Sequence, residues 1–164
     1  MKTSLAAALL SIVLAPHLSA QSLSVDPSAV RACYDSTPIG VTFPDCLGSA
    51  SDQCQLQDGG STTIGMTDCI MSENAAWDGL LNEAYQSLRA TWADREEGAG
   101  GLSGDELNAS LRDAQRAWIA FRDAECNLQY DRYRSGTIRS VVGANCLMVM
   151  TASRAIALRD MAVE

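Results

Sequence analysis

Hydrophobic residues recur at spacings of three and four along three long stretches after residue 61. This period predicts one helix over residues 62–96, a second over 103–134 and a third over 137–161. Ser103 and Glu106 have the spacing of a capping box and mark the start of the second helix. The third helix is expected to be continuous, or bent or broken near Gly143. The stripe of the first contains Met66, Ile70, Glu73, Trp77, Leu81, Ala84 and Leu88.

Residues 21–61 have a different pattern, with three prolines, three cysteines and only brief hydrophobic runs. The stretch DPSAVRACYD predicts a short helix capped by Asp26, with Pro27 in its first turn. A second short helix is expected within DCLGSASDQC. The fold class is therefore predicted to be all-α: a small disulfide-stapled helical bundle of three main helices (residues 62–164) with a short-helix N-terminal lobe (residues 21–61).

Residues 1–20 have the layout of a secretory signal peptide, with a lysine, a short apolar run and small residues before a cleavage point after Ala20. The apolar run is too short to span a bilayer, and we expect no membrane span in the mature chain. No cysteine lies near the cleavage point, which argues against a lipid anchor. The expected location is periplasmic or secreted, as a soluble protein.

Charge and composition restrict the function further. The chain carries a net charge of −8, which becomes −9 when Lys2 leaves with the signal peptide. No basic stripe is available for nucleic acid. The excess of acids favours a cationic partner, although it can equally serve solubility. Because His17 and Lys2 are the only histidine and lysine, the mature chain lacks the side chains most used as bases and nucleophiles near neutral pH, and we predict that it is not an enzyme.

An even number of cysteines in an exported protein predicts three disulfides, for which 15 pairings exist. Proximity along the chain suggests the pairs Cys33–Cys46, Cys54–Cys69 and Cys126–Cys146. Zinc is disfavoured because no CxxC pair is present and no histidine remains. The acidic linker DREEGAGGLSGDE lacks the glycine position of a calcium loop and is interpreted as a solvated connection. No cofactor is expected.

Charged residues fall on the stripes that should be buried. At about 100° per residue, Arg122 and Glu125 lie within roughly 40° of Trp118, on the face that should also bury Phe121. Unpaired buried charges are costly, so these groups are expected to form ion pairs across the helix interfaces. A catalytic carboxylate pair is disfavoured, because neighbouring arginines would keep both acids ionised. The predicted buried charge network comprises Glu73, Asp78, Arg122, Glu125 and Arg154.

At these residues the sequence resembles the lysozyme-inhibitor-like LprI family, over about residues 62–159. The resemblance rests on three motifs, one in each long helix. The first is Glu73, Asp78, Leu81, Asn82 and Tyr85; the second is Gln115, Trp118, Phe121, Arg122, Asp123, Glu125 and Cys126; the third is Cys146, Thr151, Arg154 and Leu158. The resemblance implies an exported helical domain with a bridge between Cys126 and Cys146.

Two functions follow as hypotheses. The first is an exported binding protein that inhibits a lysozyme-type muramidase by protein–protein contact, since an acidic chain would be steered toward a cationic lysozyme. The second is a non-enzymatic structural or stress-related envelope protein that binds another exported protein or peptidoglycan. The candidate partner-binding acids are Asp94, Glu96, Glu97, Asp105 and Glu106.

Overall fold

Five α-helices make up the fold in the computed structural model, which describes residues 23–93 and 101–163. They are α1 (Pro27–Ser36), α2 (Ser49–Gln55), α3 (Thr63–Ala93), α4 (Gly104–Arg132) and α5 (Arg139–Met161). The described residues contain no β-strand. The predicted all-α class, with three main helices and a short-helix lobe, is confirmed. The predicted signal peptide lies outside the described residues.

Local hydrogen bonds set the start of α4. Ser103 caps α4: its hydroxyl accepts from the Glu106 N–H, and the Glu106 carboxylate accepts from the Ser103 N–H, which confirms the predicted capping box. Helix α5 runs through Gly143 as one element from Arg139 to Met161, so the alternative of a break at this glycine is wrong.

Local residues also set the starts of the two short helices in the lobe. The Asp26 side chain accepts from the Ser28 N–H, and Pro27 occupies the first turn of α1, as predicted. Helix α2 is shorter than the stretch DCLGSASDQC, because Gly48 has a left-handed conformation with φ of 91° and the helix begins only after it. A residue with a side chain would be strained in that conformation.

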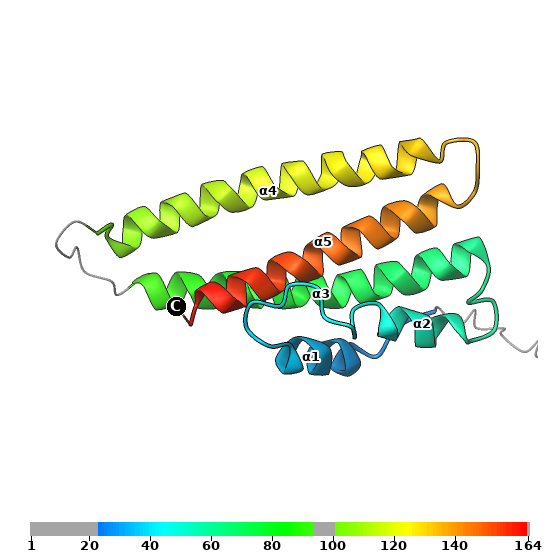
Figure 1. Cartoon of the computed structure of the whole chain (residues 1–164), viewed down its shortest axis with the longest axis horizontal. Coiled ribbons are helices and arrows are strands. Elements are labelled where there is room, and N and C mark those ends of the chain that lie inside the picture. Colours follow the sequence, from blue (N-terminus) through cyan, green and yellow to red (C-terminus); the bar gives the residue numbers. More distant parts are fainter. Residues whose placement is uncertain (1–22, 94–100, 164) are drawn as a thin grey trace, which may run out of the picture.

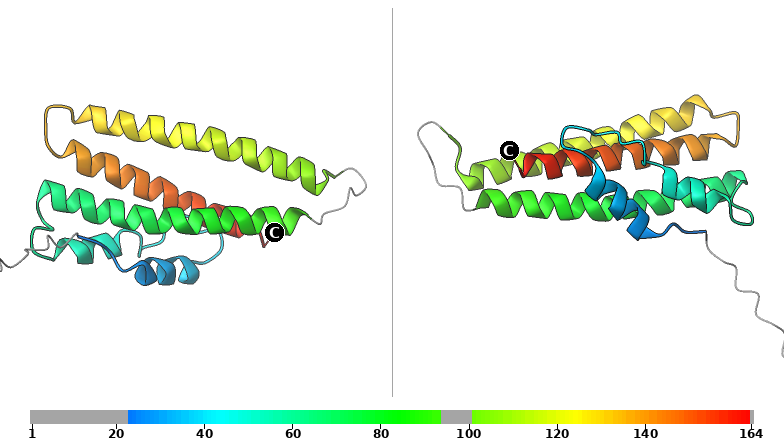
Figure 2. Two further views of the ribbon diagram at one scale, coloured as in Figure 1. Left: turned by 180° about the vertical axis from the view of Figure 1, so that it is seen from behind. Right: turned by 60° about the horizontal axis from the view of Figure 1, so that its bottom comes forward.

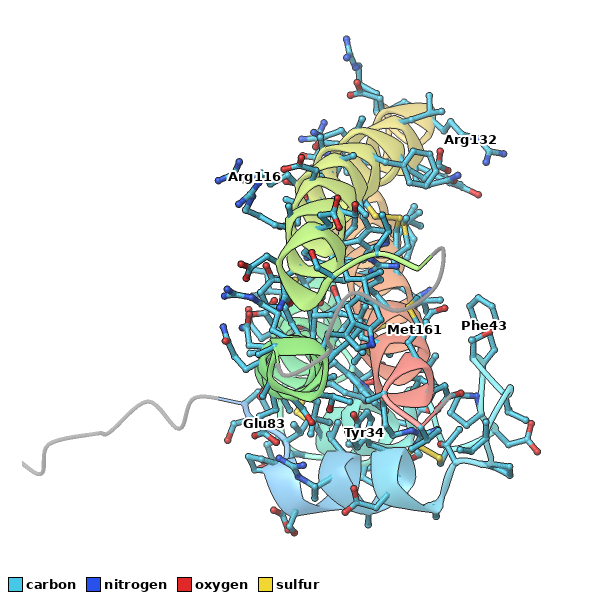
Figure 3. The ribbon with its side chains drawn as sticks, turned by 90° about the vertical axis from the view of Figure 1, so that its left-hand side faces the viewer. Tyr34, Phe43, Glu83, Arg116, Arg132 and Met161 are labelled. Atoms are coloured by element: carbon cyan, nitrogen blue, oxygen red, sulfur yellow. A yellow bond between two sulfur atoms is a disulfide. The ribbon has the colours of Figure 1, made fainter. Side chains whose placement is uncertain are left out.

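The helices form three layers (Figure 1). Helices α3 and α5 lie side by side and run in the same direction, and α4 runs the opposite way along one side of that pair. The N-terminal lobe covers the other side, which the views from behind and from below confirm (Figure 2). Viewed from its end, the bundle shows α4 above the α3–α5 pair and α1 below it (Figure 3).

The core lies mainly between α3 and α5. Trp77 and Leu88 of α3 and Ile156 of α5 are fully buried there. Ala152 and Ala155 are also fully buried, and their small side chains let α5 approach α3 closely. Helix α4 buries a narrower stripe, because it packs on this pair from one side only. Phe121 is therefore 60% exposed, and its predicted place on the buried face is wrong.

The described residues contain three disulfides, which are the pairs that proximity along the chain suggests, and two of them join different layers. Cys33–Cys46 closes the lobe, Cys54–Cys69 joins α2 to α3, and Cys126–Cys146 joins α4 to α5. Each closes a short loop, which restricts the unfolded chain and stabilises the fold by about 3 kcal/mol in the chain-entropy model.

Helix α5 is apolar enough to resemble a membrane span. It has 23 residues, and the mean hydropathy of its most apolar window is 1.6. By length and composition alone α5 could therefore cross a membrane, and the expectation that the mature chain has no membrane span stays a prediction. In the described fold, 39% of that window is buried, and α5 packs between α3 and α4 as the central helix of the bundle.

The C-terminal end of α5 is also tied to the lobe. Arg159 donates through Nη1 to the carbonyl oxygen of Tyr34 and lies 5.0 Å over the Tyr34 ring. The neighbouring Asp160 carboxylate pairs with Arg159 and accepts from the Gly40 N–H at 2.8 Å. Burial raises the pKa of the Tyr34 hydroxyl, against the opposing charge of Arg159.

A buried carboxylate fastens the lobe to α3. Glu73 is only 1% exposed and accepts from the N–H groups of Gly48 and Ser51, at 2.9 and 2.7 Å. It also accepts from Nε1 of Trp77 at 3.1 Å. Three donors from the lobe and the core thus replace the water that this carboxylate gives up on burial.

We predict that Glu73→Ala lowers the free energy of unfolding by about 3 kcal/mol or more, because three buried N–H groups would lose their acceptor. The control is Glu83→Ala on the same helix, which removes a surface ion pair with Arg31. That change should cost about 1 kcal/mol or less. Denaturant unfolding of the two variants checks this, and equal losses would contradict the role of Glu73.

Candidate functional site

The residues of the predicted buried charge network do not pair with one another. Glu73 faces the lobe, as described above. Asp78 is exposed and accepts from Nδ2 of Asn82 at 3.2 Å. Glu125 is half-buried and accepts from Nε2 of Gln129 at 2.7 Å. None of the ion pairs among the described residues joins two members of the network, so the predicted ion pairs across the helices are wrong.

The physical reason lies in the position of the lobe. The predicted pairing assumed that the inward charges of the three long helices face only one another. Instead, backbone N–H groups of the lobe satisfy Glu73, on the opposite side of α3 and α5 from α4. The arginines of α4 and α5 must therefore find other partners.

Those partners are an indole ring and polar neighbours. The guanidinium carbons of Arg122 and Arg154 lie 5.1 and 5.8 Å from the centre of the Trp118 ring. Such cation–π contacts are favourable when the cation is shielded from water. Arg122 also pairs with the adjacent Asp123 at 2.9 Å, whereas Nε of Arg154 donates to Oε1 of Gln115 at 3.0 Å. Burial lowers the pKa of Arg154.

Two of the candidate partner-binding acids lie at the start of α4. Asp105 and Glu106 are exposed in its first turn. Hydrogen bonds from the backbone N–H and then the hydroxyl of Ser103 lower the pKa of Glu106, so this acid already serves the cap. The other three candidates, Asp94, Glu96 and Glu97, lie outside the described residues.

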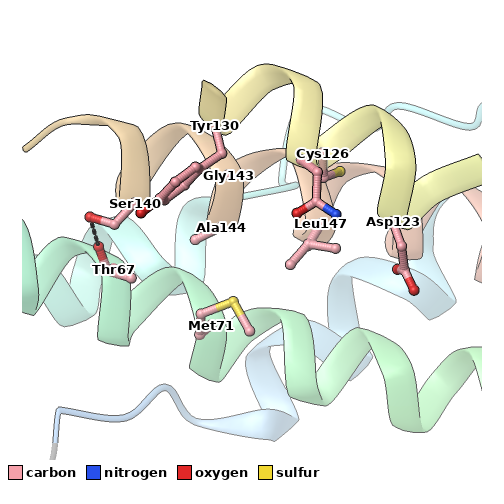
Figure 4. Close-up of a pocket in the computed structure, with 10 residues that line it drawn as sticks. Thr67, Met71, Asp123, Cys126, Tyr130, Ser140, Gly143, Ala144 and Leu147 are labelled. Atoms are coloured by element: carbon pink, nitrogen blue, oxygen red, sulfur yellow. Dashed lines mark hydrogen bonds between the residues drawn. The ribbon is translucent and has the colours of Figure 1, made fainter. Parts of the chain in front are cut away.

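A groove between α3 and α4 is a feature that the sequence did not predict. Its volume is about 450 Å³. Gly143, Ala144 and Leu147 of α5 form part of its lining (Figure 4). Thr67 and Met71 contribute from α3. The α4 side is lined by Asp123, Cys126, Asn127 and Tyr130.

One end of this groove is defined by Tyr130. Its side chain reaches from α4 toward Ser140, whose hydroxyl is hydrogen-bonded to that of Thr67 at 3.3 Å (Figure 4). A Cβ atom on Gly143 would lie only 3.4 Å from the Tyr130 ring, so the glycine allows this close contact. Arg139 lies 5.1 Å over the same ring. In the sequence, the small pair Gly143–Ala144 was the available signal for the groove.

The described part of the chain is more acidic in its first half, which includes α3. Residues 23–93 contain nine acids and two arginines, a net charge of −7, whereas residues 101–163 contain seven acids and eight arginines, a net charge of +1. Asp78 follows Met71 by seven residues, about two helical turns, and therefore lies on the same side of α3. The α3 wall thus has an exposed carboxylate in line with it, while Asp123 on the α4 wall is already paired with Arg122.

The groove between α3 and α4 has the features of a binding site. Within residues 23–93 and 101–163, no group of three or more metal-ligating side chains is close enough to hold an ion. The groove combines an apolar lining with polar groups at its ends, which is the usual composition of a surface that receives part of another molecule.

Comparison with known proteins agrees with the three motifs. The family model described as lysozyme inhibitor LprI matches residues 54–158, a range that contains α3, α4, most of α5 and the disulfides Cys54–Cys69 and Cys126–Cys146. The sequence is also 28% identical over 120 residues to the uncharacterized protein R02472 of Rhizobium meliloti (strain 1021), covering 72% of this chain and 78% of that one. No solved structure matches. Since the family model spans more than half of the chain, this protein belongs to the lysozyme inhibitor LprI family.

Proposed function

We propose that this protein inhibits a lysozyme-type muramidase by direct protein–protein contact, and that the groove between α3 and α4 is part of the contact surface. Membership of the lysozyme inhibitor LprI family is the observation that carries the proposal. Three disulfides suit a protein that works outside the cytoplasm, in the periplasm or secreted medium.

The charge distribution supports a cationic partner. The net charge of −7 on residues 23–93 is concentrated in the lobe and α3. Asp58, Asp68 and Asp78 are exposed there, and none takes part in the ion pairs among the described residues. Opposite charge raises the rate at which two proteins meet, and the effect weakens as salt screens it.

The groove supports contact at short range. Its lining of Met71, Ala144 and Leu147 suits a protruding apolar segment, and Asp78 in line with the α3 wall suits a basic side chain beside that segment. Inhibition would follow by obstruction of the saccharide cleft of the muramidase, with no chemical step on the inhibitor.

We predict saturable one-to-one binding of the oxidised chain from Gln21 onward to a cationic animal lysozyme, with loss of cell-wall lysis. Calorimetry at two salt concentrations and a lysis assay test this. Binding should weaken with salt but persist near physiological ionic strength, because apolar contact remains when charge is screened. Binding that vanishes with salt, or that leaves lysis intact, contradicts inhibition. Either result would favour an envelope protein with another exported partner or peptidoglycan as its target.

We predict that Asn127→Arg weakens lysozyme binding and inhibition by about tenfold or more, because a long cation would fill the groove and repel a cationic partner. The matched control is Ala124→Arg, which adds the same charge to the same helix at an exposed position that does not line the groove. Equal affinities for the two variants would place the contact surface elsewhere.

The two groups of acids can be separated by equal changes of charge. The variant Asp58→Asn/Asp68→Asn/Asp78→Asn removes three charges from the lobe and α3, and Asp94→Asn/Glu96→Gln/Glu97→Gln removes three from the linker. We predict that the first slows association at low salt by roughly fivefold or more, and that the second has a smaller effect. Stopped-flow association rates measure this. The reverse order would assign the contact to the linker acids, together with Asp105 and Glu106.

A further inference from the structure

A second groove follows α5 on the side away from α3, between α4 and the loop that joins α1 to α2. Phe43 projects from that loop beside α5 (Figure 3). Two adjoining cavities, of about 300 and 410 Å³, share Phe43 and Met150 and together form this α5 groove. Neither cavity has a lining residue in common with the groove between α3 and α4.

One end of the α5 groove carries an uncompensated cation. Arg154 is half-buried in the smaller cavity, and none of the ion pairs among the described residues includes it. Only its Nε has a hydrogen-bond partner among these residues, which is Gln115. The other guanidinium N–H groups remain available, and the side chain of Ser153 lines the same cavity. A partly desolvated guanidinium with free donors is suited to a carboxylate.

The other end carries an anion. Glu125 and Gln129 of α4 line the larger cavity, where the Gln129 amide donates to the Glu125 carboxylate at 2.7 Å. Glu125 likewise forms no ion pair with a described residue. One carboxylate oxygen is therefore free to accept from a cationic donor, such as an ammonium group.

The distance between the two charges can be estimated from α4. Arg154 packs on Trp118, and Glu125 follows Trp118 by seven residues, which corresponds to about 10 Å along the helix. Between the ends, the lining is apolar and consists mainly of Phe43, Val149 and Met150. Phe43 is 64% exposed, so its ring is available to cover a ligand.

We propose that the α5 groove binds the free C-terminal carboxylate of a short, extended peptide on Arg154 and Ser153, with the peptide's ammonium group near Glu125. Three extended residues span about 10 Å, which matches the separation of the two charges. Apolar side chains of the peptide pack on Phe43 and Met150. This site is independent of the muramidase contact, so each of the two proposals can fail without the other.

The test titrates the oxidised chain from Gln21 onward with the tripeptide Ala-Leu-Ala. Binding is measured by the NMR chemical shifts of Trp118 and Phe43. Saturable binding to the free peptide is expected, with affinity reduced about tenfold or more for its C-terminal amide, which removes the charge opposite Arg154. The N-acetyl peptide should bind several-fold more weakly. Octanoate supplies a carboxylate on an apolar chain without an amine. If octanoate binds as tightly as the peptide, or if no probe binds, the proposal is overturned.

Two matched substitutions separate ligand contact from packing. Arg154→Gln and Arg122→Gln each remove a guanidinium from the Trp118 ring, but only Arg154 lines the α5 groove. Arg154→Gln should weaken peptide binding by about tenfold or more, and Arg122→Gln by less than about twofold. Phe43→Ala, at an exposed loop position, should preserve the fold and weaken binding several-fold. Equal losses for the two arginine variants would show that repacking of Trp118 is responsible and would overturn the assignment.

Discussion

The buried carboxylate of Glu73 is the contact on which the arrangement of the layers depends. A charged group at 1% exposure is unfavourable unless hydrogen bonds replace its hydration, and here they come from two segments distant in sequence. The N–H groups of Gly48 and Ser51 belong to the start of α2, where the first turn of a helix always has unpaired donors. The helix start and the carboxylate therefore satisfy each other, and the lobe is held at one position on α3.

Helix α4 shows the opposite solution for charges on an inward stripe. Because it packs on the α3–α5 pair from one side only, the residues of α4 that contact this pair do not need to be wholly apolar. Arg122 and Arg154 use the Trp118 ring, Asp123 and Gln115 in place of acids on other helices. An arginine suits such a contact between helices because its planar group can stack on an aromatic ring while its nitrogens still donate hydrogen bonds.

The same limited packing leaves a groove on each side of α4. The groove toward α3 has on one side a helix from the more acidic half of the described chain, and its lining combines apolar residues with polar ones at its ends. The groove along α5 has separated charges at Arg154 and Glu125, with Phe43 between them. The two surfaces thus differ in the charge they present, and this difference is why a cationic protein segment suits one and a zwitterionic peptide suits the other. Family membership bears on the first of these functions only.

The helices and their caps can be predicted from the sequence alone. Hydrophobic period and capping are local properties, so the three long helices, the Ser103–Glu106 box and the Asp26 cap could be predicted from short stretches. The unusual positions of Glu73, Arg122 and Arg154 were also visible, because a helical wheel needs only the sequence. Their partners were not: ion pairing among them was expected, and a backbone turn and an indole ring were found instead. Which side of α3 the lobe covers, the exposure of Phe121 and the two grooves depend on how separate elements pack. These features cannot be predicted from the sequence pattern, since side-chain periodicity identifies an inward face without specifying what lies opposite it.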